Sequence, residues 1–302
     1  MSQTGGLVVV GGPTASGKTE LAVKLAIGLG TEVVSFDSRQ FYLEMKIGVA
    51  RPTSEEMQGI PHHFVASHSI HKPLTAASYA EQAAALIEKL LRERKFVVLV
   101  GGSGFYLDSL LFPTDPMPPP HPEARLQARN MSLKELQDFC ARHDPQFFAH
   151  TDPHNPVRLA RAVEIFLTTG RPFSHWRKGR VRNEARFPFI IVHPEIADAD
   201  LKQRIWKRTT TMWQAGLPDE CRTLMNWKDL SPLRTVGYNE TFEFLEGHTS
   251  ELETIQKIQV NTWQYARRQK TWFRRQYPEK YWPLADPKTF LKEIQKGKLR
   301  LW

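Results

Sequence analysis

Short apolar runs occupy residues 7–10, 32–36 and 96–100 of the chain. Each run is followed by small or polar residues, and all three are rich in β-branched side chains. Runs of this length are typical of strands buried on both faces of a parallel sheet. A fourth run, at 189–192, follows only after a long interruption. The pattern therefore predicts a parallel sheet whose last predicted strand comes late in the chain.

Helical periodicity fills the stretches around these runs. Between the second and third strands, apolar side chains at 78–94 recur three and four positions apart and form one helical face. Alternation of strand and helix predicts right-handed crossovers. We also predict a helix over 200–216, capped by Asp198 or Asp200. A long C-terminal helix carries one apolar stripe, made of Ile255, Ile258, Thr262, Tyr265, Gln269 and Trp272.

The long interruption begins with a proline-rich segment at 113–120, which is typical of a stiff linker. Helical periodicity then returns, and Gly170 is predicted to end the last of these helices. We interpret 116–186 as an all-helical insertion domain, which leaves 1–115 and 187–302 as a discontinuous core. The predicted fold class is α/β, with a P-loop parallel-sheet core, helices on both of its faces, and the helical insertion.

Charge adds a candidate partner to this picture. The formal net charge is +9, which favours a polyanionic partner such as nucleic acid. Basic residues gather in the insertion and its exit, at Arg158, Arg161, Arg171, Arg177, Lys178, Arg180, Arg182 and Arg186, and in the terminal helix, at Arg267, Arg268, Lys270, Arg274 and Arg275. Aromatic residues interleave with the second group, a combination that suits RNA.

Other features exclude several classes of protein. Cys140 and Cys221 are distant and belong to no CxxC motif, which argues against a disulfide scaffold or a zinc module. The histidines between 62 and 71 lack carboxylate or cysteine partners at ligand spacing, so we assign no metal site to them. The first predicted strand leaves no room for a secretion signal, and no apolar run approaches membrane-spanning length. We expect a cytoplasmic monomer without a membrane partner.

The motif with the most chemical content directly follows the first predicted strand. It consists of Gly12, Pro13, Thr14, Ala15, Ser16, Gly17, Lys18 and Thr19. A glycine-rich turn between a strand and a helix presents backbone N–H groups at the helix N-terminus, and these form an anion site. In this P-loop pattern the lysine reaches the terminal phosphates and the hydroxyl after it binds Mg²⁺. The motif predicts binding of a diphosphate or polyphosphate.

Ligands of open parallel sheets bind where the strands end. Asp37, Ser38, Arg39 and Gln40 follow the second predicted strand, and a glycine-rich segment with Ser103 follows the third. We interpret Asp37 as a general base or metal ligand, with a helix cap as the alternative. The third strand lacks the magnesium-binding aspartate of motor and switch NTPases. A small-molecule kinase or group transferase therefore fits better than an ATP-driven machine.

A pair of arginines, Arg204 and Arg208, shares one face of the helix predicted over 200–216. Either side chain is suited to clamp a diphosphate by charge. The alternative is that both lie on a solvated surface.

The ordered motifs of the chain resemble those of the tRNA dimethylallyltransferases, also called tRNA isopentenyltransferases. The matching segments are GGPTASGKTELA, EVVSFDSRQFYLEMKIGVARP, PHHF, VLVGGSGFYLDSLL, NPVRLARAVEIFLTTGRP, LKQRIWKRT, RTVGY and YARRQKTWFRR. This family transfers a dimethylallyl group from dimethylallyl diphosphate to the exocyclic amine of the adenosine just 3′ of the anticodon. The resemblance covers nearly the whole chain and implies this activity, with an insertion domain that binds the anticodon stem-loop of tRNA.

The resemblance also implies roles for individual residues. Asp37, Ser103 and Arg204 would be catalytic, with Asp37 taking the proton of the amine. The residues that hold the diphosphate would be Arg204 and the P-loop from Gly12 to Thr19, with Mg²⁺ on Thr19. The positions that match tRNA contacts are Asp37, Ser38, Arg39, Gln40, Ser103, Arg125, Arg158, Arg161, Arg234, Gly237 and Tyr238.

Three positions depart from the family pattern. Ser103 replaces the common threonine and keeps its hydroxyl, and Val49 replaces a threonine with little expected effect. Val157 stands where a glutamine is usual, so that side-chain contact to tRNA is in doubt. No Cys/His zinc finger of the eukaryotic members is present near the C-terminus, which favours a bacterial-type enzyme.

Three other functions stay open. An adenylate isopentenyltransferase would prenylate free AMP, ADP or ATP, but it needs no long basic surface. A P-loop kinase for a small molecule would explain the loop and Asp37, but not the RTVGY segment or the arginine-rich stretches. An RNA-binding protein with an inactive P-loop is disfavoured because Lys18, Thr19, Asp37 and Ser103 are all present.

Overall fold

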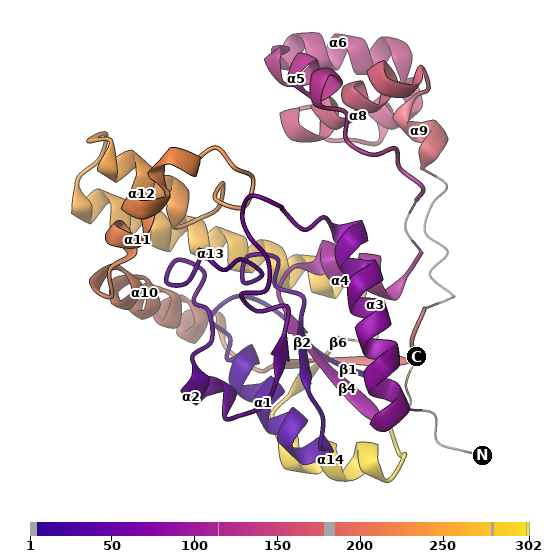
Figure 1. Ribbon diagram of the computed structural model, residues 1–302, viewed down its shortest axis with the longest axis vertical. Helices are drawn as coiled ribbons and strands as arrows, with labels where there is room; N and C mark the ends of the chain where they lie inside the picture. The colour runs from indigo at the N-terminus through magenta and orange to yellow at the C-terminus, as the bar shows by residue number, and fades with distance from the viewer. Residues whose placement is uncertain (1–4, 114, 178–184, 279–280, 300, 302) are drawn as a thin grey trace. The chain divides into compact units, whose positions relative to one another are not determined.

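The computed structural model describes residues 5–113, 115–177, 185–278, 281–299 and 301 (Figure 1). It divides into two compact units, one formed by Met1–Leu111 with Ala185–Trp302 and the other by Phe112–Glu184. The borders expected from the sequence, at 116 and 186, lie near those of the second unit. Three of the basic residues expected at its exit, Lys178, Arg180 and Arg182, lie outside the described residues.

The larger unit is built on a parallel sheet whose described part has the strand order β3-β2-β4-β1-β5-β6. The strands are β1 (Gly6–Gly11), β2 (Val33–Ser35), β3 (His62–His63), β4 (Phe96–Gly101), β5 (Phe189–Pro194) and β6 (Tyr281–Leu284). The four predicted strands are confirmed. The edge strands β3 and β6 were not predicted, because β3 consists of two histidines, the short apolar run of β6 contains a proline, and both pair with distant segments.

Helices cover both faces of this sheet (Figure 1). Alternate strand positions, such as Val10 and Val98, join one buried core with Leu25 and Phe290. These two side chains come from α1 (Lys18–Leu29) and α14 (Pro287–Gln295). On the other face, α3 (Ala76–Glu93) packs against β4 and against α4 (Gly104–Leu111). The predicted α/β class with a doubly covered sheet is thus confirmed.

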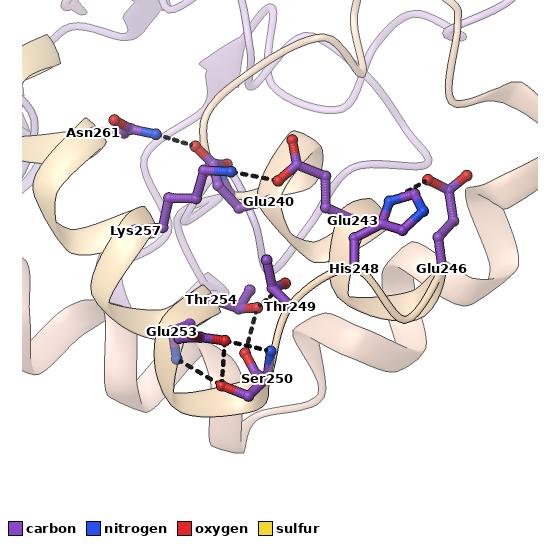
Figure 2. A network of polar contacts seen from close by, with 11 residues as sticks. Glu240, Glu243, Glu246, His248, Thr249, Ser250, Glu253, Thr254, Lys257 and Asn261 are labelled. Atoms are coloured by element: carbon purple, nitrogen blue, oxygen red, sulfur yellow. Dashed lines mark hydrogen bonds and ion pairs between the residues drawn. The ribbon is translucent and has the colours of Figure 1, made fainter.

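The remaining helices of the larger unit bring distant segments together. They are α2 (Ser54–Met57), α10 (Asp198–Gln214), α11 (Leu217–Leu224), α12 (Tyr238–Leu245) and α13 (Glu251–Gln276), with a 3₁₀ turn at Met225–Trp227. The helix α13 packs against α10 and α12. Figure 2 shows the polar side of its contact with α12, where Lys257 pairs with Glu243 and Asn261 with Glu240.

The predicted cap of α10 is wrong. The helix begins at Asp198, after Ala197, and no side chain caps it. Asp198 and Asp200 lie inside the first turn instead, where the interaction of their negative charge with the positive end of the helix dipole is stabilising.

The regular structure in the described part of the smaller unit is all helical, as predicted. Its helices are α5 (Pro122–Asn130), α6 (Leu133–His143), α7 (Pro145–Ala149), α8 (Pro156–Thr169) and α9 (Phe173–Trp176). Leu159 and Val163 of α8 form its core with Leu136 and Cys140 of α6. Gly170 ends α8 at a φ of 67°, a left-handed conformation that glycine adopts without strain.

Candidate functional site

The P-loop connects β1 directly to α1. Gly12 and Gly17 have φ values of 133° and 90°, and Ala15 has a φ of 63°. These conformations turn the chain sharply, so that α1 begins at Lys18. The first N–H groups of a helix have no partner within the helix, and the helix dipole adds positive potential at the same place. The structure therefore has the anion-binding geometry that the sequence predicted.

The side chain of Lys18 folds back over this loop. Its Nζ donates a hydrogen bond to the carbonyl oxygen of Pro13 at 2.6 Å, and Ser16 Oγ donates to the same oxygen at 2.9 Å. Burial lowers the pKa of Lys18 to about 8; the charge of Asp37 opposes this shift and that of Arg208 adds to it. An arriving diphosphate would favour the charged ammonium, because opposite charges stabilise each other at short range.

Both arginines of α10 reach the P-loop. Arg208 Nη2 donates to Thr14 Oγ1 at 2.5 Å. Burial lowers the pKa of Arg208, while the nearby charge of Asp37 opposes that shift. Arg204 is exposed, and its Nη1 lies 3.6 Å from the position that a Cβ on Gly17 would take. The helix thus brings two guanidinium groups to the loop.

A buried glutamine on α13 joins the P-loop to the end of β4. Gln269 Oε1 accepts a hydrogen bond from the Thr14 N–H at 2.9 Å, and Gln269 Nε2 donates to the Gly102 carbonyl at 2.9 Å. A Cβ at Gly102 would collide with this amide. The two loops are therefore fixed to each other through one side chain.

Asp37 follows β2 in a tight turn, with no helix after it. Its Oδ1 accepts the Arg39 N–H at 3.2 Å, and its carbonyl accepts the Gln40 N–H at 3.0 Å. The alternative role as a helix cap is therefore wrong. Pairing of β2 with β4 places this turn beside the end of β4, which also lies next to β1 and the P-loop.

Three side chains with hydroxyl groups lie at the Asp37 turn. Ser103 Oγ accepts the Ser38 N–H at 3.0 Å and lies 2.9 Å from Ser38 Oγ. Tyr265 of α13 lies near Ser103, and burial together with the charge of Asp37 raises the pKa of Tyr265 to about 12. Asp37, Ser38 and Ser103, predicted as site residues, thus meet at one edge of the sheet.

Other predicted contacts to tRNA are engaged within the protein. Arg39 Nη1 donates to the carbonyl of Pro232 at 3.0 Å, and Gln40 Nε2 donates to that of Ala50 at 3.1 Å. Arg234 is exposed and pairs with Asp229 at 2.9 Å.

The pair Gly237 and Tyr238 offers little side-chain surface to an RNA. Gly237 precedes α12 at a φ of 96°, and its N–H donates to Glu240 Oε2 at 2.7 Å. Tyr238 is fully buried, and its hydroxyl donates to Glu220 Oε1 at 2.5 Å. Both residues are therefore placed to shape the backbone around them.

In the smaller unit, the predicted contacts differ in exposure. Arg125 on α5 and Arg158 on α8 are exposed. Arg161 is held within the unit, since Nη1 pairs with Glu164 at 2.6 Å and Nη2 donates to the Pro118 carbonyl at 2.7 Å. Val157 is 79% exposed, so the position where a glutamine is usual does face solvent.

Three further features bear on possible ligands or a membrane. Within the described ranges, no group of three or more His, Cys, Asp or Glu side chains is arranged to hold a metal ion. A cavity of about 710 Å³ lies away from the P-loop, at Lys46, Arg51, Thr53 and His62 among others. No helix in the described part of the chain combines the length and the apolar character needed to cross a bilayer.

The family model described as IPP transferase matches residues 40–276. The chain belongs to the IPP transferase family. It is similar to the tRNA dimethylallyltransferase of Cytophaga hutchinsonii, with 37% identity over 278 residues, 88% of this chain and 89% of the relative. The relative from Geobacillus thermodenitrificans is 32% identical over 308 residues and 98% of each chain. The solved tRNA isopentenylpyrophosphate transferase of Bacillus halodurans superposes with a TM-score of 0.68 at 29% identity, covering 97% and 95% of the two chains.

In this member of the IPP transferase family, sequence reasoning missed two residues of the site and left a solvated surface as the alternative for a third, Arg208. Arg208 was paired with Arg204 on one helix face, but only the structure shows its bond to Thr14. Gln269 and Tyr265 were placed on the buried stripe of α13 without a role. Their polar groups were the available signal, because a buried polar side chain needs a hydrogen-bonding partner.

Proposed function

We propose that the chain transfers a dimethylallyl group from dimethylallyl diphosphate to the exocyclic amine of adenosine 37 in tRNA, next to the anticodon. The observation that carries this proposal is the electrostatic grouping of Lys18, Arg208 and Asp37 at the P-loop. Cationic groups for a departing diphosphate and a carboxylate for an amine proton are what this reaction needs. The proposal is supported by similarity, over most of the chain, to relatives named tRNA dimethylallyltransferase.

In the proposed reaction, the bond between the allylic carbon and the diphosphate oxygen breaks while a bond from the adenine nitrogen to that carbon forms. The carboxylate of Asp37 accepts the proton that the amine loses, as a general base. Negative charge grows on the departing diphosphate. Lys18, Arg204, Arg208 and the loop amides stabilise this charge, which lowers the barrier because they are already in place.

A magnesium ion fits this arrangement. The Thr19 hydroxyl lies in the first turn of α1, directly after Lys18. Together with the diphosphate oxygens it offers the oxygen ligands that Mg²⁺ prefers. When bound there, the ion supplies further positive charge beside the leaving group.

The acceptor base must leave its stack to reach Asp37. Ser38, Ser103 and Tyr265 form the hydroxyl network that borders this carboxylate. We assign to this network the orientation of the flipped adenine against the diphosphate. Ser103 keeps the hydroxyl that the network needs, so the serine at this position is compatible with the reaction.

The smaller unit is proposed to bind the anticodon stem. Arg125 and Arg158 are exposed there and suit phosphate contacts. The proposed working form is a monomer in the cytoplasm. The buried free thiols of Cys140 and Cys221 are consistent with a reducing compartment.

The direct test incubates the purified protein with dimethylallyl diphosphate, Mg²⁺ and tRNA, followed by mass spectrometry of the nucleosides. Isopentenyladenosine in tRNA is the expected product. The same assay with AMP distinguishes an adenylate isopentenyltransferase, and ATP consumption without prenyl transfer would indicate a kinase. A tRNA pool without any prenylated adenosine would overturn the proposal.

A further inference from the structure

A single carboxylate on α11 receives four hydrogen bonds. Glu220 accepts the backbone N–H groups of Lys46, Ile47 and Gly48 at 3.1, 2.7 and 3.1 Å. It also accepts the Tyr238 hydroxyl at 2.5 Å. Hydrogen bonds to an ionised acceptor are stronger than those between neutral groups. Glu220 therefore holds three consecutive amides of one loop, residues 46–50, from a segment far away in the sequence.

The ring of Tyr238 defines how closely this loop approaches. A Cβ at Gly48 would collide with the Tyr238 ring, so only glycine fits this position without displacement. The ring itself is fully buried. Burial and the charge of Glu220 raise the pKa of Tyr238, which keeps its hydroxyl a neutral donor.

The last residues of the same loop are bonded to the Asp37 turn. Gln40 Nε2 donates to the carbonyls of Val49 and Ala50 at 3.4 and 3.1 Å. Gln40 also donates its own N–H to the Asp37 carbonyl at 3.0 Å. The loop at 46–50 is thus bonded both to Glu220 and to the turn that carries the proposed general base.

The backbone next to Tyr238 is linked to α13 by hydrogen bonds. Gly237 N–H donates to Glu240 Oε2, and Glu240 Oε1 accepts from Asn261 of α13 at 2.7 Å (Figure 2). The same helix bonds the P-loop through Gln269. The P-loop, which would hold the diphosphate, and the chain of contacts that leads to Asp37 are therefore both bonded to α13.

We propose that Glu220 is a positioning residue, which holds the 46–50 loop and, through Gln40, the Asp37 turn in register with the P-loop. This inference rests on the proposed function, since the register matters for transfer between the two bound substrates. The Glu220 carboxylate bonds the loop amides and the Tyr238 hydroxyl, so in this proposal it acts through the loop rather than on a substrate. Its effect belongs to the chemical step, because small displacements of a reacting group lower the rate strongly.

The test compares Glu220→Gln with Asp219→Asn. The neighbour Asp219 is an exposed carboxylate on the same helix that pairs with Arg222, so its variant is a matched acid-to-amide control. In Glu220→Gln the new NH₂ group cannot accept the loop amides. We expect kcat to fall on the order of 10- to 100-fold, with the KM and Kd for dimethylallyl diphosphate within about twofold of wild type, because the P-loop is untouched.

Hydrogen exchange on the protein without substrate provides the second readout. Amides at 46–48 should exchange faster in Glu220→Gln and remain protected in Asp219→Asn, while the P-loop and α13 stay unchanged. Tyr238→Phe keeps the ring and removes one donor, so it should fall between wild type and Glu220→Gln in both readouts.

Several outcomes would overturn the proposal. Unchanged exchange at 46–48 would show that Glu220 does not hold the loop, and faster exchange with normal kcat would show that the loop does not position Asp37. A uniform rise in exchange across the fold would indicate a role in stability alone. If the wild-type protein transfers no prenyl group, the proposed function fails, and the positioning role in that reaction fails with it. In that case, the exchange comparison still decides whether Glu220 holds the loop.

Discussion

Asp37 is the residue to which we assign the general-base role. Its backbone is fixed by the tight turn after β2, and its charge acts to raise the pKa of Lys18, Arg208 and Tyr265. We propose that this carboxylate receives the amine proton, and its charge raises the pKa of Lys18 and of Arg208 against the effect of burial.

Replacing Asp37 with alanine should lower kcat by about 10²–10⁴-fold, the range typical of a lost general base. Binding of dimethylallyl diphosphate at neutral pH should persist, because Lys18 and the loop amides remain. Steady-state kinetics and calorimetric binding measure the two effects. Glu81→Ala removes an exposed carboxylate from α3 and serves as control. A near-normal rate in Asp37→Ala would leave the residue with a structural role only.

Lys18 predicts a pH dependence of binding. Burial lowers its pKa in the free protein from the usual 10.5 to about 8, so the ammonium loses its charge as the pH rises through about 8. A diphosphate favours the charged form. Affinity for dimethylallyl diphosphate should therefore be full below this pH and decrease above it.

Calorimetric titrations of wild type and Lys18→Arg across this pH range test the assignment. Arginine stays charged throughout, so the variant should show a flatter pH profile even if its affinity is lower overall. Identical profiles would assign the pH dependence to another group.

Among the elements, α13 links the parts of the site. Gln269 bonds Thr14 of the P-loop and Gly102 after β4, and Tyr265 lies near Ser103. A single rigid helix thus sets the spacing between the loops at the ends of β1 and β4.

Gln269→Ala should reduce the free energy of unfolding by about 1–3 kcal/mol, because a buried N–H and a buried carbonyl lose their partner. It should also weaken dimethylallyl diphosphate binding, since the P-loop is no longer tied to its neighbour. Denaturant unfolding and calorimetry measure the two effects. Gln264→Ala, an exposed position on the same helix, should change neither. Equal effects of both substitutions would contradict the linking role.

At the scale of the whole molecule, the proposed reaction and the proposed RNA binding involve different units. The larger unit contains the P-loop and Asp37, and the smaller one carries exposed arginines on a small helical core. The net charge of +9 fits an RNA partner.

Arg158→Ala should weaken tRNA binding and reduce the slope of log K against log salt by about one, as expected for one lost phosphate contact. Binding assays at several salt concentrations provide this slope. Arg92→Ala removes the same charge from the exposed surface of α3 and should leave the slope unchanged. If the Arg158 variant keeps the wild-type slope, its guanidinium does not contact phosphate.

The local parts of the fold and the site were predictable from contiguous residues. The four inner strands, the long helices and the helical second unit follow from apolar periodicity, which acts over a few residues. The P-loop and the Asp37 turn follow from motifs placed directly after strands. The cap of α10 failed because either aspartate satisfies the same local pattern, and the backbone begins the helix one residue earlier than a cap requires.

The sequence by itself determined the α/β class and the phosphate loop, and it located Lys18 and Asp37 as the residues of the proposed chemistry, because each depends on a short segment. Only the tertiary structure decided that Arg208 joins Arg204 at the loop, that Gln269 ties two loops, and that Glu220 holds a third. Those side chains lie far along the chain from their partners. Their roles depend on which polar groups packing brings within hydrogen-bonding distance, and no local pattern records that.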